Sequence, residues 1–445
     1  MPTLLTPPAL APSRSTRLRS VLVACPDARP PAYEAVIGLA ESGSLGRFVT
    51  GFYYGGHGPL SELARRYVPC HFHRLRRQLL RRNDRRIPAD RVTSAPSFDA
   101  ALAIENRLTG QPEARRWVAA YRTRRFDRLV ARRIEAIRPD AAFLFSDVGS
   151  EFALPACRRL GIPIVLSMVH GDVREEREVL DREEIKSPDY FPLYLGDGRL
   201  DRPAMDWLHA RRLRDIALAD RILVPSDHIA ETLARHGTPR DRIAVIPYAA
   251  DIRRFRPIAD KVQGRDCTFL FAGGITQRKG IKYLLEAWGR VRRPGWRLQL
   301  LGALPSRLGP LADDLKMEGV EHLGRVGHGE MPARMAEADV FVFPSLFEGS
   351  AVVTYEALAC GLPSIATAAS GTVARDGLEG FLVPSGDSEA LADRMDRLGR
   401  DPALRATMGL AARRRAEEFD WPRYRESIRS VVADLVLSGQ PRAEP

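Results

Sequence analysis

The sequence predicts an α/β protein with two domains, each built on a doubly wound parallel sheet. Its 445 residues exceed the roughly 250–300 at which a single hydrophobic core stops growing. Short apolar runs alternate with helical stretches, and the same rhythm restarts in the second half, as in parallel α/β sheets. We predict a linker around 251–266. The predicted segments are a disordered leader at 1–17, domains at 18–252 and 253–420, and a last helix with a tail at 421–445.

The predicted strands are short apolar runs that are bounded by turn-forming residues. Those of the first half lie at 20–24, 48–53, 142–145, 164–168, 221–224 and 243–246. Those of the second half lie at 268–272, 297–301, 321–323, 340–343, 364–366 and 381–383. A long arginine-rich helix is predicted at 112–137, where a proline suits the first turn. The charged segment 173–203 is expected to be a mobile loop.

Cysteine content and hydropathy predict a cytoplasmic protein. No apolar run approaches the ~18 residues of a membrane span, and prolines interrupt the N-terminus where a signal peptide needs a continuous apolar helix. The cysteines are scattered and odd in number, which argues against a disulfide framework and a zinc site. They are Cys25, Cys70, Cys157, Cys267 and Cys360.

The net charge of +12 is concentrated in the segment 65–91, which holds ten arginines and two aspartates. One interpretation is a solvated helical face. Another is contact with an anionic membrane surface or a lipid-diphosphate acceptor, because apolar side chains interleave with the arginines as they do in interfacial segments. Nucleic acid is disfavoured, since no known binding signature is present. The interleaved side chains are Tyr67, Phe72, Leu75, Leu79 and Leu80.

The segment 340–363 carries the most chemical information. It reads as a buried strand that ends at Pro344, a loop with Glu348 and Gly349, and a helix that starts near Ala351 with Ser350 as its N-cap. Free backbone N–H groups and the positive end of the helix dipole meet at such a junction. We therefore expect it to bind a phosphate group.

Two carboxylates flank this predicted phosphate site, Glu348 before the helix and Glu356 within it. Alone, such a pair would be read as solvated surface charge. Beside a phosphate site, a carboxylate repels the anion and is better suited to accept hydrogen bonds from hydroxyl groups. Hydroxyl groups on both sides of a phosphate are typical of a sugar nucleotide.

These residues resemble the motif PS-x-x-EG … EA-x-A-x-G-x-P of the family-4 glycosyltransferases, which have the GT-B fold. The first part reads Pro344-Ser345-Leu346-Phe347-Glu348-Gly349, and the second spans 356–363. The resemblance continues through 364–367 and 376–384. It implies a GT-B architecture, with two Rossmann-like domains that face each other across a cleft. It also implies that the last helix crosses back onto the first domain.

The loop 271–280 is not a Walker loop. Such a loop needs Gly before its lysine and Ser or Thr after it, whereas Arg278 and Gly280 stand there. It resembles the diphosphate loop of the family, with Lys279 in place and Gly273 and Gly274 at its start. Gly274 stands where the family has an arginine. Arg278 is therefore expected to supply the missing charge.

The resemblance implies roles for two further positions. His170, just after a predicted strand, is expected to contact the donor sugar or the acceptor, although a lone histidine is as often structural. Val326 lies in the stretch 325–328, whose backbone is expected to meet the base. The segment 173–203 is expected to lie near the acceptor.

The resemblance implies a retaining enzyme that transfers a hexose from a nucleotide diphosphate sugar to an acceptor hydroxyl. The leaving phosphate itself takes the proton of the acceptor. Glu348 would orient the hexose and Glu356 the ribose diol, while Gly349, Ser350 and Ala351 offer backbone N–H groups. The nucleotide sugar is a substrate, and no cofactor is expected.

No Asp-x-Asp motif occurs, so we expect no metal site. The acceptor is expected to be a sugar, a lipid-linked saccharide or a polysaccharide precursor. Two alternatives stay open. One is a non-catalytic basic protein at a membrane or nucleic acid. The other is a different GT-B enzyme, such as a sugar-nucleotide epimerase.

Overall fold

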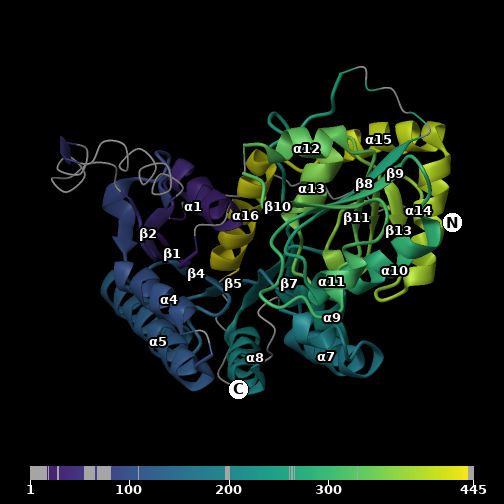
Figure 1. Ribbon diagram of the computed structural model, residues 1–445. Coiled ribbons are helices and arrows are strands. Elements are labelled where there is room, and N and C mark those ends of the chain that lie inside the picture. Colours follow the sequence, from purple (N-terminus) through teal and green to yellow (C-terminus); the bar gives the residue numbers. More distant parts are fainter. Residues whose placement is uncertain are drawn as a thin grey trace.

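The computed structural model describes residues 18–438 except 19, 28–29, 55–65, 68–81, 109, 196–200, 260, 262–263, 265 and 328. These residues form two parallel sheets with helices packed around each, and the chain passes from one to the other between β7 and β8 (Figure 1). The predicted fold class is confirmed. No helix of the described part is long and apolar enough to cross a membrane. The predicted leader at 1–17 lies outside the described residues, as do 65 and 68–81 of the basic segment.

The first domain contains a sheet with the strand order β3-β2-β1-β4-β5-β6-β7. Its central strands β1 and β4 are buried along their whole length, because helices cover both faces of the sheet. The strands are β1 Val21–Ala24, β2 Leu45–Thr50, β3 Val92–Ser94, β4 Ala141–Phe145, β5 Ile164–Ser167, β6 Arg221–Val224 and β7 Ile243–Val245. The helices are α1 Pro30–Glu41, α4 Pro96–Arg107, α5 Pro112–Ile137, α6 Ala153–Leu160, α7 Val173–Lys186, α8 Arg202–Leu218 and α9 Asp227–Arg235, with short 3-10 turns η2 Ala89–Arg91, η3 Phe191–Leu193 and η4 Arg240–Arg242.

The second domain contains a sheet with the order β10-β9-β8-β11-β12-β13. Its strands are β8 Cys267–Ala272, β9 Trp296–Leu301, β10 Val320–Gly324, β11 Val340–Phe343, β12 Ser364–Ala366 and β13 Gly380–Leu382. Its helices are α10 Ile281–Val291, α11 Leu311–Asp314, α12 Met331–Glu337, α13 Val352–Ala359, α14 Ser388–Arg400 and α15 Pro402–Glu417, with 3-10 turns η5 Gln277–Lys279 and η6 Ala368–Ser370. The last helix, α16 Trp421–Leu437, follows α15.

Every predicted strand coincides with a strand of the structure to within a few residues, but β3 was not predicted. This strand has three residues, Val-Thr-Ser, at the edge of the first sheet, and none of them is buried. A strand so short and so polar contains no apolar run by which it could be predicted.

The prediction of a mobile loop at 173–203 is wrong for most of its length, because α7 occupies its first half. The Asp172 side chain caps this helix by accepting a hydrogen bond from the Arg174 amide at 2.9 Å. Val179 and Leu180 on its buried face pack with Tyr194 and Tyr283 in a separate apolar cluster. Residues 196–200 of the segment lie outside the described part.

Two elements connect the domains. The helix α16 returns to α1, where Arg425 Nη1 lies 2.6 Å from Glu34 Oε2 and the Tyr424 hydroxyl donates to the Pro31 carbonyl at 3.3 Å (Figure 1). The helix α7 reaches the second domain through Glu183, which accepts hydrogen bonds from Gln277 Nε2 at 2.6 Å and from the Tyr283 hydroxyl at 2.8 Å. The cleft is therefore held from two sides.

Candidate active site

A cavity of about 1050 Å³ lies between the two domains and is lined by residues of both. Asp147 follows β4, His170 follows β5 and Glu348 follows β11, so the cavity lies at the carboxyl ends of the strands. Parallel α/β sheets bind their ligands at this edge.

A cluster of three charges lies where the loop after β11 reaches the cavity. Glu348 Oε1 forms an ion pair with Lys279 Nζ and lies 3.5 Å from Arg278 Nη1 and 3.1 Å from the Ser345 hydroxyl oxygen. Burial lowers the pKa of Lys279, and the Glu348 carboxylate opposes this shift. In the ligand-free protein, Glu348 thus serves as the counter-ion of two cations.

The loop that carries these cations is fastened to the end of β11. Gly280 has a φ of +74°, and a Cβ there would lie 2.0 Å from the Pro344 carbonyl oxygen, so only glycine fits. The Arg278 carbonyl accepts hydrogen bonds from the Leu346 amide at 2.8 Å and from the Ser345 hydroxyl at 3.1 Å. These contacts explain why the cations meet the Glu348 carboxylate although about 70 residues of sequence separate them.

The start of α13 differs from the sequence prediction. Its N-cap is Ala351, without a side-chain hydrogen bond. Ser350 is not the N-cap, because its hydroxyl donates to the Gly371 carbonyl at 2.7 Å and lies 3.2 Å from the Tyr355 hydroxyl. The Ala351 amide donates to the Ser370 carbonyl at 3.0 Å, so the expectation that it would be available to a phosphate is wrong.

The predicted donor residues do not all reach the cavity. Arg278, Glu348, Gly349 and Ser350 line it, as does His170. Lys279 does not line the cavity, but its ion-pair partner Glu348 does. The others do not line it: Gly273, Gly274, Ala351, Glu356 and Val326.

Glu356 lies in the second turn of α13. Burial raises its pKa to about 7, and the charge of Arg254 opposes this shift. The carboxyl group of Glu356 is therefore partly protonated at neutral pH in the ligand-free protein. Val326 is half-buried against the core of the second domain, and His328 lies outside the described residues.

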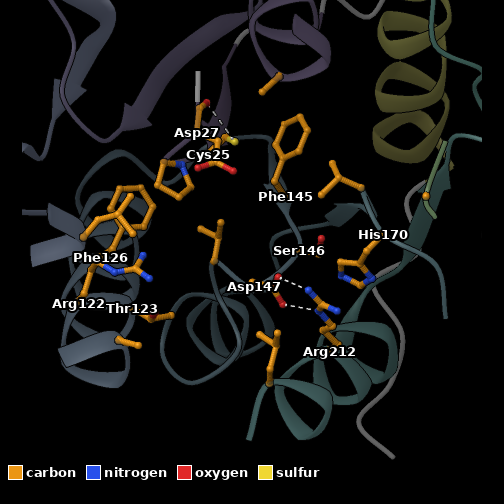
Figure 2. Close-up of a pocket in the computed structure, with 18 of the residues that line it drawn as sticks. Cys25, Asp27, Arg122, Thr123, Phe126, Phe145, Ser146, Asp147, His170 and Arg212 are labelled. Atoms are coloured by element: carbon orange, nitrogen blue, oxygen red, sulfur yellow. Dashed lines mark hydrogen bonds and ion pairs between the residues drawn. The ribbon is translucent and has the colours of Figure 1, made fainter. Parts of the chain in front are cut away.

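His170 presents a neutral imidazole. Its Nδ1 lies 2.8 Å from the Gly171 carbonyl oxygen, which only accepts hydrogen bonds, so Nδ1 carries the hydrogen. Nε2 is buried and has no hydrogen-bond partner among the described residues. Burial and the Arg212 charge lower the pKa to about 4, against the opposing effect of Asp147. Nε2 is thus a free acceptor at the wall of the cavity (Figure 2).

An ion pair that the sequence did not predict lies beside this histidine. Arg212 on α8 donates to both carboxylate oxygens of Asp147, with Nε–Oδ1 at 2.9 Å and Nη2–Oδ2 at 3.0 Å (Figure 2). Asp147 has a left-handed backbone with a φ of 72°, and its amide donates to Asp215 at 3.0 Å. Burial alone would raise the pKa of Asp147, but Arg212 holds it below the ordinary value. The only signal in the sequence was an aspartate two positions after a buried strand.

No group of three His, Cys, Asp or Glu side chains in the described part is arranged to hold a metal ion.

Two family models match the chain. The model described as Glycosyltransferase Family 4 matches residues 70–254, and the model described as Glycosyl transferases group 1 matches residues 266–401. One falls on each domain.

Curated relatives match over part of their length. A D-inositol 3-phosphate glycosyltransferase of Pseudarthrobacter chlorophenolicus is 35% identical over 249 residues, which are 52% of this chain and 59% of the relative. The putative colanic acid biosynthesis glycosyltransferase WcaL of Salmonella typhimurium is 30% identical over 231 residues, 48% of this chain and 57% of the relative. The chain thus spans a little over half the length of the curated relatives that it matches.

Solved structures share the fold. Sucrose-phosphate synthase from Thermosynechococcus elongatus superposes with a TM-score of 0.59 at 18% identity, over 94% of this chain and 100% of the other. HepE of Anabaena, in complex with UDP and glucose, gives a TM-score of 0.58 at 16% identity, over 94% and 100%. At these identities the likeness is one of fold.

The pKa of His170 makes folding stability depend on pH. The folded-state pKa of about 4 lies below the ordinary 6.5, so the unfolded chain takes up the proton first as the pH falls. The stability from this group is fully present above pH ~6.5 and is lost toward pH ~4. We predict that His170→Asn reduces the change in the free energy of unfolding over this pH window by about 3 kcal/mol, as measured by urea unfolding.

The matched control is His322→Asn, since His322 is exposed on β10. An equal change of slope in both variants would contradict the assignment of a buried, neutral His170.

Proposed function

The chain belongs to the family-4 glycosyltransferases of the GT-B fold, and from this premise we propose that it transfers a hexose from a nucleotide diphosphate sugar to an acceptor hydroxyl. The transfer retains the anomeric configuration and needs no metal ion. The observation that carries the proposal is the charge cluster of Glu348, Arg278 and Lys279 at the cavity.

The cluster suits a diphosphate leaving group. The bond between the sugar C1 and the phosphate oxygen breaks, and its electron pair remains on the phosphate. The acceptor oxygen bonds to C1 on the same face, and its proton passes to the leaving phosphate. Because negative charge grows on the diphosphate, cations already in place stabilise the transition state more than the ground state.

Donor binding would exchange the partners of Glu348. The diphosphate oxygens take the place of its carboxylate beside Arg278 and Lys279. The released carboxylate then accepts hydrogen bonds from the hexose hydroxyl groups. His170 Nε2 is a buried acceptor without a partner in the described structure, and it accepts a hydrogen bond from a further hydroxyl group of the sugar.

The names and bound ligands of similar proteins support this choice of substrates. HepE was solved with UDP and glucose, and WcaL is named for colanic acid biosynthesis. We propose a sugar, a lipid-linked saccharide or a polysaccharide precursor as acceptor, and contact of the segment 65–91 with an anionic membrane surface.

The role of Glu356 is tested by nucleotide binding. If its carboxylate holds the ribose diol, Glu356→Ala lowers affinity for the matching nucleotide about tenfold to a hundredfold in calorimetry with UDP, GDP and ADP. Binding by the native protein should also release protons near pH 7, because burial holds the pKa of Glu356 at about 7 in the free protein and the ionised form accepts the hydroxyls.

The control is Glu389→Ala, which removes a carboxylate that is 78% exposed. Unchanged nucleotide affinity in Glu356→Ala would end this assignment.

The two cations are tested by kinetics. Arg278→Ala should lower kcat about 100-fold while changing the donor Kd much less, because the diphosphate gains charge in the transition state. Lys279→Ala should also free Glu348 from its ion pair and so impair donor binding. Lys316→Ala is the control, since its side chain is 75% exposed on the second domain. Strict dependence of the native enzyme on a divalent metal, seen with a chelator, would contradict the proposal.

Membrane contact is tested by co-sedimentation with vesicles. Each basic residue near an anionic surface contributes about 1 kcal/mol within a Debye length of ~8–10 Å. Binding should therefore be strong to anionic vesicles, weak to neutral ones and absent in high salt. Neutralising Arg76, Arg77, Arg81 and Arg82 together should release the protein.

The matched control neutralises four exposed arginines of α5, namely Arg125, Arg128, Arg132 and Arg133. Equal release by both quadruple variants, or no preference for anionic vesicles, would assign 65–91 to a solvated helical face.

A further inference from the structure

The cavity extends from the charge cluster of Glu348 to a wall formed by α5 and α8 of the first domain. We propose that this wall binds an uncharged saccharide portion of the acceptor, with Trp117 and Trp207 as stacking surfaces. This inference rests on the proposed glycosyl transfer. The α5–α8 wall consists of Arg116, Trp117, Arg122, Arg124 and Trp207.

Trp117 is an unusual residue for an exposed helix face. Its side chain is 69% exposed although it lines the cavity. Its ring stacks on Tyr121 with centroids 5.5 Å apart and planes at 5°, and Arg125 Nη1 donates to the Tyr121 hydroxyl at 2.9 Å. The ring is thus held in one orientation from behind while most of its surface stays open. Large exposed aromatic rings are typical of binding sites.

Trp207 joins Trp117 on the same wall because the N-terminal ends of α5 and α8 are tied together. Arg116 Nη1 lies 2.9 Å from Asp201 Oδ1, and this oxygen also caps α8 by accepting from the Ala204 amide at 3.1 Å. The Arg211 guanidinium lies 5.0 Å from the Trp207 ring centroid. A sugar ring has an apolar C–H face that packs against such planes.

The charges of the wall decide which kind of saccharide fits. Each arginine of the wall has a carboxylate partner. The pairs are Arg116–Asp201 at 2.9 Å, Arg122–Glu105 at 2.9 Å and Arg124–Glu151 at 2.8 Å. An anion would have to displace a carboxylate from one of these pairs. A hydroxyl group both donates and accepts, so it bonds to both members of a pair without separating them.

The size of the cavity agrees with two occupants. About 1050 Å³ lies slightly above the roughly 300–1,000 Å³ typical of small-molecule sites. A donor sugar beside Glu348 and His170 leaves the α5–α8 wall open to a second saccharide. In Figure 2, Arg122 and Phe126 lie on the opposite side of the cavity from His170 and Arg212.

The experiment measures saccharide binding to the nucleotide-saturated protein. The probes are neutral trisaccharides, matched trisaccharides with a uronic acid or a sulfate group, and the neutral ones on an octyl aglycone. We expect neutral probes to bind, free and octyl-linked alike, with a change in tryptophan fluorescence. Trp117→Ala and Trp207→Ala should each lower the affinity for the neutral probes about tenfold. Trp117→Phe should retain most of the native affinity.

The control is Leu410→Ala, which removes a side chain that is 64% exposed on α15 of the second domain. Preference for anionic probes, binding that ignores Trp117→Ala, or binding of octyl-linked probes alone would overturn the proposal. Nucleotide titration of the same native protein separates a failure of the proposed function from a failure of the proposed saccharide site. Absent nucleotide binding contradicts the proposed function, whereas nucleotide binding without any neutral saccharide contradicts only the role of the wall.

Discussion

The close approach of two backbones, one from each domain, is the constraint on which the cleft depends. A Cβ on Gly349 would lie 2.3 Å from the Val169 carbonyl oxygen, and one on Gly171 would lie 2.5 Å from the Phe347 ring. Glycine at both positions lets the loop after β11 meet the loop after β5. The same contact brings His170 and Glu348 to one cavity. Side chains at either glycine would separate the carboxyl ends of the two sheets.

Around this contact, the buried charges of the cleft occur in pairs. Glu348 is shared by Lys279 and Arg278, and Asp147 pairs with Arg212. A buried ion without a partner costs several kcal/mol, so these pairs keep the ligand-free cleft stable. The charge cluster holds one more cation than carboxylate, which suits an anionic diphosphate.

The helix α7 connects these sites mechanically. Glu183 bonds Gln277 and Tyr283 of the second domain, and the Tyr194 carbonyl accepts from the Arg278 amide at 3.3 Å. Arg278 belongs to the charge cluster. Contacts from the first domain therefore hold the loop on which donor binding is proposed to depend. A change in the angle between the domains would move this loop relative to the cavity.

The sequence determined the parts of this protein that depend on local pattern. Apolar runs located the strands of both sheets, and the order of strand, glycine-bearing loop and helix located the junction at Glu348. The motifs around 344–363 and 271–280 identified the family, because they combine several residues at fixed spacing. Proline at the first turn placed the start of α5 at Pro112, where the structure has it.

Tertiary structure decided everything that depends on contacts between distant segments. Ser350 looked like an N-cap, but the Gly371 carbonyl, which comes from another loop, takes its hydroxyl. The Ala351 amide likewise donates its hydrogen bond to the Ser370 carbonyl of that other loop. Asp147 and Arg212 are 65 positions apart and form a pair only because α8 packs beside the end of β4. The wall of Trp117 and Trp207 likewise exists only in three dimensions. Local propensity fixes which elements form, whereas packing fixes which polar groups are left for a ligand.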